Sequence, residues 1–258
     1  MVYKRKRSFR RKSFRKSRRG KYSRKTRFAS RVKGVLLRTA ETKKYQFADE
    51  NVQLNHNAGV AAASATPSLA QPFNIWAAIS KGTSSFNRIG DRIIPRGMSL
   101  KIWLANKLDR PNLMYRIIIA KVPKAINAVA TTQNNVDPFD ALQLGNTGNR
   151  IILNLDRDRG IKALYDKVFT INAGYNASSV GTNLVPSPNN VAREAHLYKK
   201  LWIKSKNSKP IIFDSTTSSQ IVNNPLMVWV IAYDSYGTLT SDTVASLSYY
   251  GVCYFKDI

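Results

Sequence analysis

The chain has 258 residues, of which 42 are Lys or Arg and 15 are Asp or Glu, so its formal net charge is +27. Such an excess of positive charge favours a polyanionic partner. One cysteine excludes an intrachain disulfide. No apolar run approaches the roughly 18 residues of a membrane span, so we expect no membrane insertion. The basic N-terminus is too long for a secretory signal and no apolar h-region follows it, so we expect no such signal.

Residues 1–38 form a basic arm that holds 18 of the 42 Lys and Arg residues and no acid, since the first carboxylate is Glu41. Its self-repulsion and its shortage of large aliphatic side chains predict an arm without a fold of its own, which stays extended until a polyanion neutralises it. We predict that the arm binds nucleic acid through Lys4, Arg5, Lys6, Arg7, Arg10, Arg11, Lys12, Arg15, Lys16, Arg18, Arg19, Lys21, Arg24, Lys25 and Arg27.

Aromatic residues interrupt the basic clusters of the arm, at Tyr3, Phe9, Phe14, Tyr22 and Phe28. Lys and Arg neutralise phosphates without reading sequence, whereas aromatic rings stack on exposed bases, which favours single strands. The alternative is a solvated tail or a nuclear-import signal. A signal needs only one cluster, so we predict that Lys4, Arg5, Lys6 and Arg7 also direct nuclear import.

Residues 39–258 are long enough for one large all-β domain. Alternating apolar residues predict a first strand from residue 43 to residue 54, followed by a loop over 55–88 in which the apolar segment 73–79 is a short helix or a clip against a neighbour. Strands are then predicted at 98–108 and 113–122, and the turn residues at 109–112 predict that these two strands form a hairpin.

The second half of the chain continues this pattern. Strands or strand-like segments are predicted at residues 151–155, 161–171, 196–206, 211–213, 226–233 and 244–255. The apolar run at 226–233 predicts a strand covered on both faces. Two long loops, 123–149 and 172–194, suit exposed or inter-subunit surface. About eight strands with almost no helical periodicity favour a sandwich or jelly roll.

A second candidate nucleic-acid site lies on the segment 196–206. Alternation puts Tyr198, Lys200, Trp202 and Lys204 on one strand face, where basic and aromatic side chains could contact a single strand. The alternative is a solvated face on which the lysine stems cover Trp202.

Other polar or reactive residues predict structural roles. The turn at residues 156–160, with two Asp and two Arg, is read as a surface salt-bridge turn rather than a divalent-ion site. Cys253 is expected in the core, and His56 and His196 are expected to be structural or exposed. Because no catalytic or phosphate-cradling motif is present, we expect no enzymatic activity, no metal and no cofactor.

The order of features, a basic arm and then about eight strands with long loops, resembles the capsid proteins of small icosahedral viruses. The segment NRIGDRI at residues 87–93 resembles the stretch before strand C in capsid proteins of Rep-encoding circular single-stranded DNA viruses, the circovirus-like and geminivirus-like group. The segment LYDK at 164–167 and the Lys-containing residues 197–204 resemble the middle strands of that group.

This resemblance implies a single all-β jelly roll of eight strands in two facing antiparallel sheets, preceded by a disordered basic arm. It implies a T=1 icosahedral shell of about 60 copies whose inward arms package a single-stranded DNA genome. It also implies a location in the virion. From the basic clusters of the arm we expect passage through the host nucleus during assembly, with host nuclear import receptors as partners.

The residues alone leave two alternatives open. DNA and RNA present the same phosphates, so the arm also suits an RNA-packaging satellite-type capsid. It suits a non-viral nucleic-acid-binding protein of the ribosomal or chromatin type as well. For such a protein a large all-β body with two long loops is unnecessary, which makes the body the distinguishing feature.

Overall fold

The computed structural model describes residues 31–32, 34–35, 40–60, 73–76, 79–107, 110, 112–123, 138–139, 148–172, 195–205, 210–213, 221, 223, 225–235, 238–239 and 242–257. The chain divides into two units, Met1–Ala40 and Glu41–Ile258. The strands all lie in the second unit. Among the residues that the structure describes, no helix has the length and hydrophobicity needed to cross a membrane.

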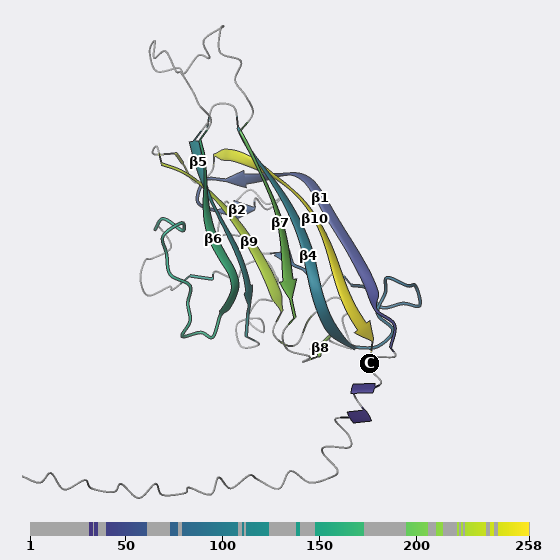
Figure 1. The fold of residues 1–258 in the computed structure, drawn as a ribbon. Coiled ribbons are helices and arrows are strands. Elements are labelled where there is room, and N and C mark those ends of the chain that lie inside the picture. Colours follow the sequence, from purple (N-terminus) through teal and green to yellow (C-terminus); the bar gives the residue numbers. More distant parts are fainter. Residues whose placement is uncertain are drawn as a thin grey trace, which may run out of the picture. The chain divides into compact units, whose positions relative to one another are not determined.

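Two antiparallel sheets build the second unit (Figure 1). The strands are β1 (Lys43–Asn55), β2 (Gly59–Val60), β3 (Phe73–Asn74), β4 (Arg92–Asn106), β5 (Asn112–Lys121), β6 (Lys162–Asn172), β7 (His196–Lys204), β8 (Ile211–Ile212), β9 (Leu226–Asp234) and β10 (Thr243–Asp257). Sheet A has the order β2-β1-β10-β4-β7, with β8 also beside β4, and sheet B has the order β3-β9-β5-β6. This arrangement is the predicted all-β jelly roll.

One hydrophobic core lies between the sheets. Strand alternation sends Leu100 and Ile102 of β4 inward from sheet A, while Ile117 and Ile119 of β5 come from sheet B. All four side chains are fully buried, and each such burial contributes roughly 1.5–3 kcal/mol. The strand predicted at residues 98–108 is therefore confirmed as part of β4, and so are the strands predicted at β1, β6, β7, β9 and β10.

The predicted hairpin between the two central strands is wrong. β4 lies between β10 and β7 in sheet A, whereas β5 lies between β9 and β6 in sheet B. Two strands that are consecutive along this part of the chain thus belong to different sheets. The physical reason is that both strands carry a fully apolar face, and these faces bury more surface by meeting across the core than by lying side by side in one sheet.

Two further segments differ from expectation. Phe73–Asn74 forms a strand, β3, that pairs with β9, and the following Ile75 and Trp76 enter the core, so the segment is neither a helix nor a free clip. The predicted strand at 151–155 is a turn that leaves one isolated bridge, between Leu155 and Phe139. Propensity alone does not separate such short apolar segments, because tertiary pairing decides them.

A second apolar cluster covers the outer face of sheet B. Ile118 of β5 and Trp229 of β9 point away from the main core and pack with Phe139, Ile151 and Ile161. This covering explains why β9 is buried on both faces, as its apolar run predicts. The loop expected to be exposed at 123–149 thus contributes a buried residue, Phe139, while residues 173–194 of the second loop lie outside the described part of the chain.

Candidate nucleic-acid interface

The structure describes only one of the two predicted nucleic-acid sites. All the arm residues predicted to bind phosphate, including the import cluster, fall within residues 4–27 and lie outside the described residues. The second site, on β7, lies entirely within the described residues.

β7 is an edge strand of sheet A and pairs only with β4 among the described strands of the sheet. Its burial alternates residue by residue, with Leu197, Leu201 and Ile203 packed against the core. Tyr198, Lys200, Trp202 and Lys204 therefore lie together on the outer side, as the period of two in the sequence predicts.

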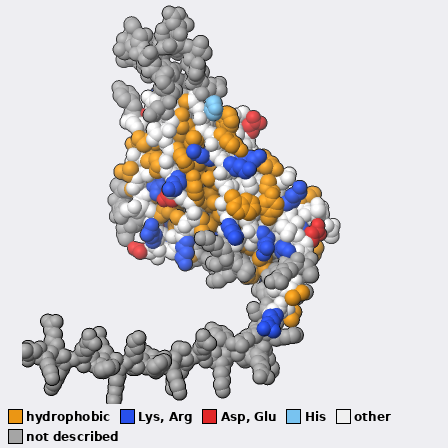
Figure 2. Space-filling model, viewed as in Figure 1, with side chains coloured by type: hydrophobic (Ala, Val, Ile, Leu, Met, Phe, Trp, Pro, Cys, Tyr) orange, Lys and Arg blue, Asp and Glu red, His pale blue; other side chains and the backbone are white. Residues whose placement is uncertain are grey.

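The register extends this surface over the two neighbouring strands. Across β4, Lys200 lies opposite Lys101, and Tyr198 lies opposite Trp103. Across β10, Lys101 in turn lies opposite Tyr250. We call the resulting surface the outer face of sheet A, formed by Lys101, Trp103, His196, Tyr198, Lys200, Trp202, Lys204, Ser248, Tyr250 and Tyr254. Figure 2 shows it, with Lys and Arg side chains scattered among hydrophobic ones.

The indole of Trp202, whose paired residue on β4 is Ser99, lies over Gly97 of the same strand. A Cβ atom at Gly97 would come within 2.8 Å of Cζ2 of Trp202. The Tyr254 ring lies beside the indole, with 5.8 Å between ring centroids. The side chain of Trp202 nevertheless remains 59% exposed. Glycine inside a strand often marks such a close approach, and here it leaves one indole face open to solvent.

A second aromatic group lies further along the same two strands. The Trp103 ring stacks on His196 at a centroid distance of 4.6 Å and an interplanar angle of 11°, and Tyr198 is tilted against it at 6.3 Å. Trp103 is 45% exposed and Tyr198 50% exposed. Nearby, Lys101 Nζ lies 5.5 Å from the ring centroid of Tyr250, within cation–π range.

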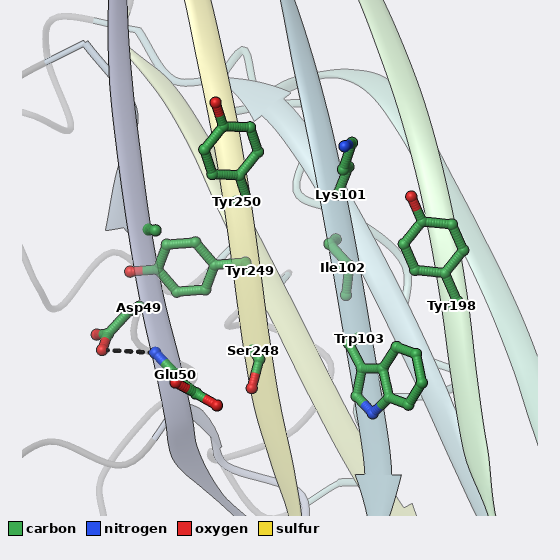
Figure 3. A pocket seen from close by; sticks show the side chains of 10 residues that line it. Asp49, Glu50, Lys101, Ile102, Trp103, Tyr198, Ser248, Tyr249 and Tyr250 are labelled. Carbon is green, nitrogen blue, oxygen red and sulfur yellow. Dashed lines mark hydrogen bonds between the residues drawn. The ribbon is translucent and has the colours of Figure 1, made fainter.

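A shallow depression of about 620 Å³ separates this aromatic group from β1 (Figure 3). Lys101, Trp103 and Tyr198 lie on one side of it, while Asp49 and Glu50 lie on the other. The two acids sit where the pairing of β1 with β10 shifts register after Asp49, at a bulge in which Asn51 has a φ of 57°. Asn tolerates this left-handed conformation better than most residues, so the bulge is compatible with its sequence.

Charge is distributed unevenly over this surface. The segments 44–48, 96–105, 196–204 and 246–254 of β1, β4, β7 and β10 contain no Asp or Glu. The acids nearest to the outer face in Figure 3 are those at the β1 rim. The face therefore offers cations beside half-exposed aromatic rings, a combination that can bind phosphates and stack on bases.

The sequence identified only part of this surface. Alternation within β7 located Lys200, Trp202 and Lys204, whereas Lys101, Trp103 and Tyr250 were not recognised as members of the same site. Their contribution depends on the register of β4 with β7 and β10, strands that are about 100 to 150 residues apart in the chain. The alternating Ser99, Lys101 and Trp103 pattern was the available signal.

The remaining polar candidates have structural partners. Asp156 accepts a hydrogen bond from the backbone N–H of Arg159 at 2.9 Å, and its other oxygen lies 3.4 Å from Nε of Arg159, which forms the expected salt-bridge turn. Nδ1 of the buried His56 accepts the N–H of Asp234 at 3.1 Å. No cluster of three metal-ligating side chains occurs within the described ranges.

Cys253 is fully buried in the main core, as expected. Burial raises the pKa of its thiol, because the thiolate would lose its hydration. A neutral, enclosed thiol of this kind is a packing residue.

Comparisons with protein-family models and with curated proteins find no match for this chain.

Proposed function

We propose that this chain is the capsid protein of a small single-stranded DNA virus, which assembles with copies of itself into an icosahedral shell and packages the genome through its basic arm. Two features support the proposal together. The folded unit is a jelly roll with a well-filled core, and the most basic part of the chain precedes it as a separate segment. The sequence resemblance to circovirus-like and geminivirus-like capsid proteins favours DNA over RNA.

The observation that carries the proposal is the separation of charge from fold. Residues 1–38 hold 18 Lys and Arg and no acid, whereas residues 39–258 hold the other 24 together with all 15 acids. A shell of about 60 copies would bring about 1,080 arm charges together, on the order of the phosphates of a small genome. The arms would collapse onto phosphate, which couples assembly to genome loading, and the jelly rolls would form the wall.

The same proposal assigns partners and location. The cluster formed by Lys4, Arg5, Lys6 and Arg7 would bind host nuclear import receptors, so new subunits would reach the nucleus before assembly. The mature protein would then reside in the virion. No catalytic step is part of this function.

Two other functions remain to be separated by experiment. An RNA-packaging satellite-type capsid would use the same arm, and sequencing the protected nucleic acid distinguishes it. A monomeric ribosomal or chromatin-type binding protein would elute near its mass of 29.0 kDa in size-exclusion chromatography, whereas a shell elutes in the void volume.

Removing the arm tests the mechanism. A chain without residues 1–38 should keep the core and unfold at nearly the same urea concentration, but particles should contain no nuclease-protected nucleic acid. A matched control keeps the length of the arm and replaces its Lys and Arg by Gln, which should give the same loss if charge is the cause. Packaging at normal yield by either variant would contradict the proposal.

A further inference from the structure

We infer that the outer face of sheet A is a second nucleic-acid site, which binds unpaired bases of the packaged single strand. The inference rests on the proposed function for the source of that strand. The bases stack on an aromatic trio, Trp103, Tyr198 and Trp202, and the phosphates lie beside a lysine trio, Lys101, Lys200 and Lys204.

The exposure of the aromatic trio indicates a binding surface rather than part of the core. The fold buries other large rings, since Trp76 and Trp229 lie in its interior. Trp103, Tyr198 and Trp202 instead remain about half exposed on one continuous surface. The Trp202 indole lies over Gly97, and Trp103 is held by its stack on His196. Rings fixed in this way present open faces, on which every base can stack.

Charge complementarity selects the occupant. The strand segments that form this face carry lysines and no acids, so a second copy of the same face would place lysine against lysine. The basic arm of the chain, with 18 positive charges, would be repelled for the same reason. A polyanion with flat apolar groups satisfies both features of the surface, and a nucleic-acid strand has that chemistry.

The shape of the surface favours a single strand over a duplex. A duplex keeps its bases stacked inside, and its major groove admits a helix or a two-stranded ribbon. The outer face of sheet A spans β10, β4 and β7, too broad for such a groove. Bases reach the aromatic trio only when they are unpaired.

Two acidic residues bound the site on the β1 side and indicate how a bound strand would be oriented. Asp49 and Glu50 line the β1 side of the depression, opposite the lysine side (Figure 3). Phosphates are therefore drawn to β4 and β7 and repelled from β1. Trp202 lies opposite Ser99, four residues from Trp103 on β4, which separates the backbone positions of the two tryptophans by about 13 Å along the strands. The bound strand accordingly runs along β4 and β7, from one indole to the other.

The lysines have a competing explanation, because charged side chains on an edge strand also discourage pairing with another sheet. That role requires cations on β7 but requires neither Lys101 on the central strand β4 nor open aromatic rings. Gln variants separate the two roles: loss of solubility without loss of oligonucleotide binding would favour edge protection and overturn the site.

Photocrosslinking of the unaltered full-length protein gives the first test. The probe is a 20-nucleotide oligodeoxynucleotide that contains 5-iododeoxyuridine, and adducts are mapped by mass spectrometry. The expected adducts fall on the aromatic trio as well as on arm residues such as Tyr3 or Phe9. Adducts confined to residues 1–38 would overturn the inference.

A double variant, Trp103→Ala with Trp202→Ala, gives the second test. Binding of oligothymidylate is compared with binding of an abasic phosphodiester of the same length, which retains the charge and lacks the bases. We expect oligothymidylate to bind about tenfold more weakly or worse, while the abasic ligand binds as before. The control is Phe86→Ala, which removes an aromatic ring that is 54% exposed outside the strands. An equal change for both ligands, or none, would refute base stacking.

The lysine trio is tested by salt. Replacing Lys101, Lys200 and Lys204 by Gln should lower the slope of log binding constant against log salt by up to about 2 for a single strand. The control is Lys167→Gln, an exposed lysine on β6 of sheet B. A slope that changes no more than in the control would count against phosphate contacts on this face.

The two proposals fail in different ways. If shells form and protect nucleic acid while the aromatic and lysine variants bind normally, the second site is wrong and the proposed function stands. If the unaltered protein neither assembles nor protects nucleic acid, the proposed function is wrong even when the face binds bases in solution.

Discussion

The two sheets follow the same alternation rule but treat their outer faces differently. On sheet B, Ile118 and Trp229 point outward and are covered by Phe139, Ile151 and Ile161. On sheet A, Trp103 and Trp202 point outward and stay half exposed among lysines. The difference teaches that an apolar outward residue is not by itself a binding site. A binding site is better indicated by an aromatic ring that stays solvent-exposed beside charges of one sign.

A buried arginine helps to hold the segment around Ile151 against the outer face of sheet B. Arg116 forms a two-pronged ion pair with Asp166, with both N–O distances at 2.8 Å. Its remaining guanidinium nitrogen donates to the carbonyl oxygens of Arg150, Ile151 and Leu153. On the outer face of sheet A the indoles instead pack beside the strands, Trp202 on Gly97 and Tyr254, and Trp103 on His196 and Tyr198.

Among the variants, Arg116→Met should lower the stability of the fold the most. Arg116→Met leaves Asp166 without its cation and three carbonyl groups without a donor, so we expect a loss of about 3–5 kcal/mol in the free energy of unfolding. Urea denaturation measures it. Lys101→Met on β4 is the control, since its lysine is exposed on the open face. Equal costs for the two variants would mean that Arg116 does not hold the cover.

A second effect comes from an ion pair inside sheet A. Lys43 Nζ lies 2.7 Å from Asp257, with side-chain exposures of only 10% and 17%. Lys43→Met should therefore cost about 3 kcal/mol, because it leaves a buried carboxylate unpaired. The pair formed by Lys81 and Asp91 is a matched control at 52% and 35% exposure, and Lys81→Met should cost under about 1 kcal/mol. Thermal unfolding that fails to rank the two variants in this order would contradict the assignment.

A smaller effect depends on pH and concerns the corner where β1 approaches β9. Burial lowers the pKa of His56, and the nearby Asp234 and Asp242 only partly oppose this shift, while Arg110 adds to it. The folded state thus favours neutral His56, so stability is complete above the ordinary histidine pKa of about 6.5 and is lost as the pH falls below it.

The measurement is urea unfolding at pH 7.5 and pH 5.5. His56→Asn should reduce the pH dependence, since the amide oxygen can still accept the N–H of Asp234 but does not titrate. His196→Asn on the exposed face serves as the control. A pH dependence that survives in His56→Asn would assign it to other groups.

The smallest expected loss of stability comes from a change at Gly97, under the exposed indole of Trp202. Gly97→Ala places a methyl group within 2.8 Å of Trp202 and should lift the indole off the sheet, at a cost of about 1 kcal/mol. The emission of Trp202 should shift accordingly, measured in a variant series that includes Ser99→Ala as the control on the same strand face. An unchanged spectrum would mean that Gly97 does not set the position of the ring.

Local pattern was sufficient for most strands and for part of the site. Alternation in β7 depends only on neighbouring residues, so the exposed positions of Lys200, Trp202 and Lys204 follow from the sequence. The apolar run of β9 likewise predicts burial on both faces. The residues that cover its outer face could not be predicted, because nothing in the segments of Phe139 and Ile151 indicates which sheet they pack against.

The failures share a non-local cause. The turn after β4 is a local signal, but whether the next strand returns to the same sheet depends on strands elsewhere in the chain. The same limitation hid Lys101, Trp103 and Tyr250, which join β7 only through register. Arg116 was a missed signal, since a charged residue inside the apolar strand β5 implies a buried partner.

Electron microscopy of the purified full-length protein, after nuclease treatment and with the absorbance ratio at 260 and 280 nm recorded, tests the central claim most directly. Our account predicts uniform small shells that contain protected single-stranded nucleic acid, which sequencing would identify as DNA. Dispersed monomers that bind nucleic acid without closing into shells would contradict it and would favour a nucleic-acid-binding protein of another kind.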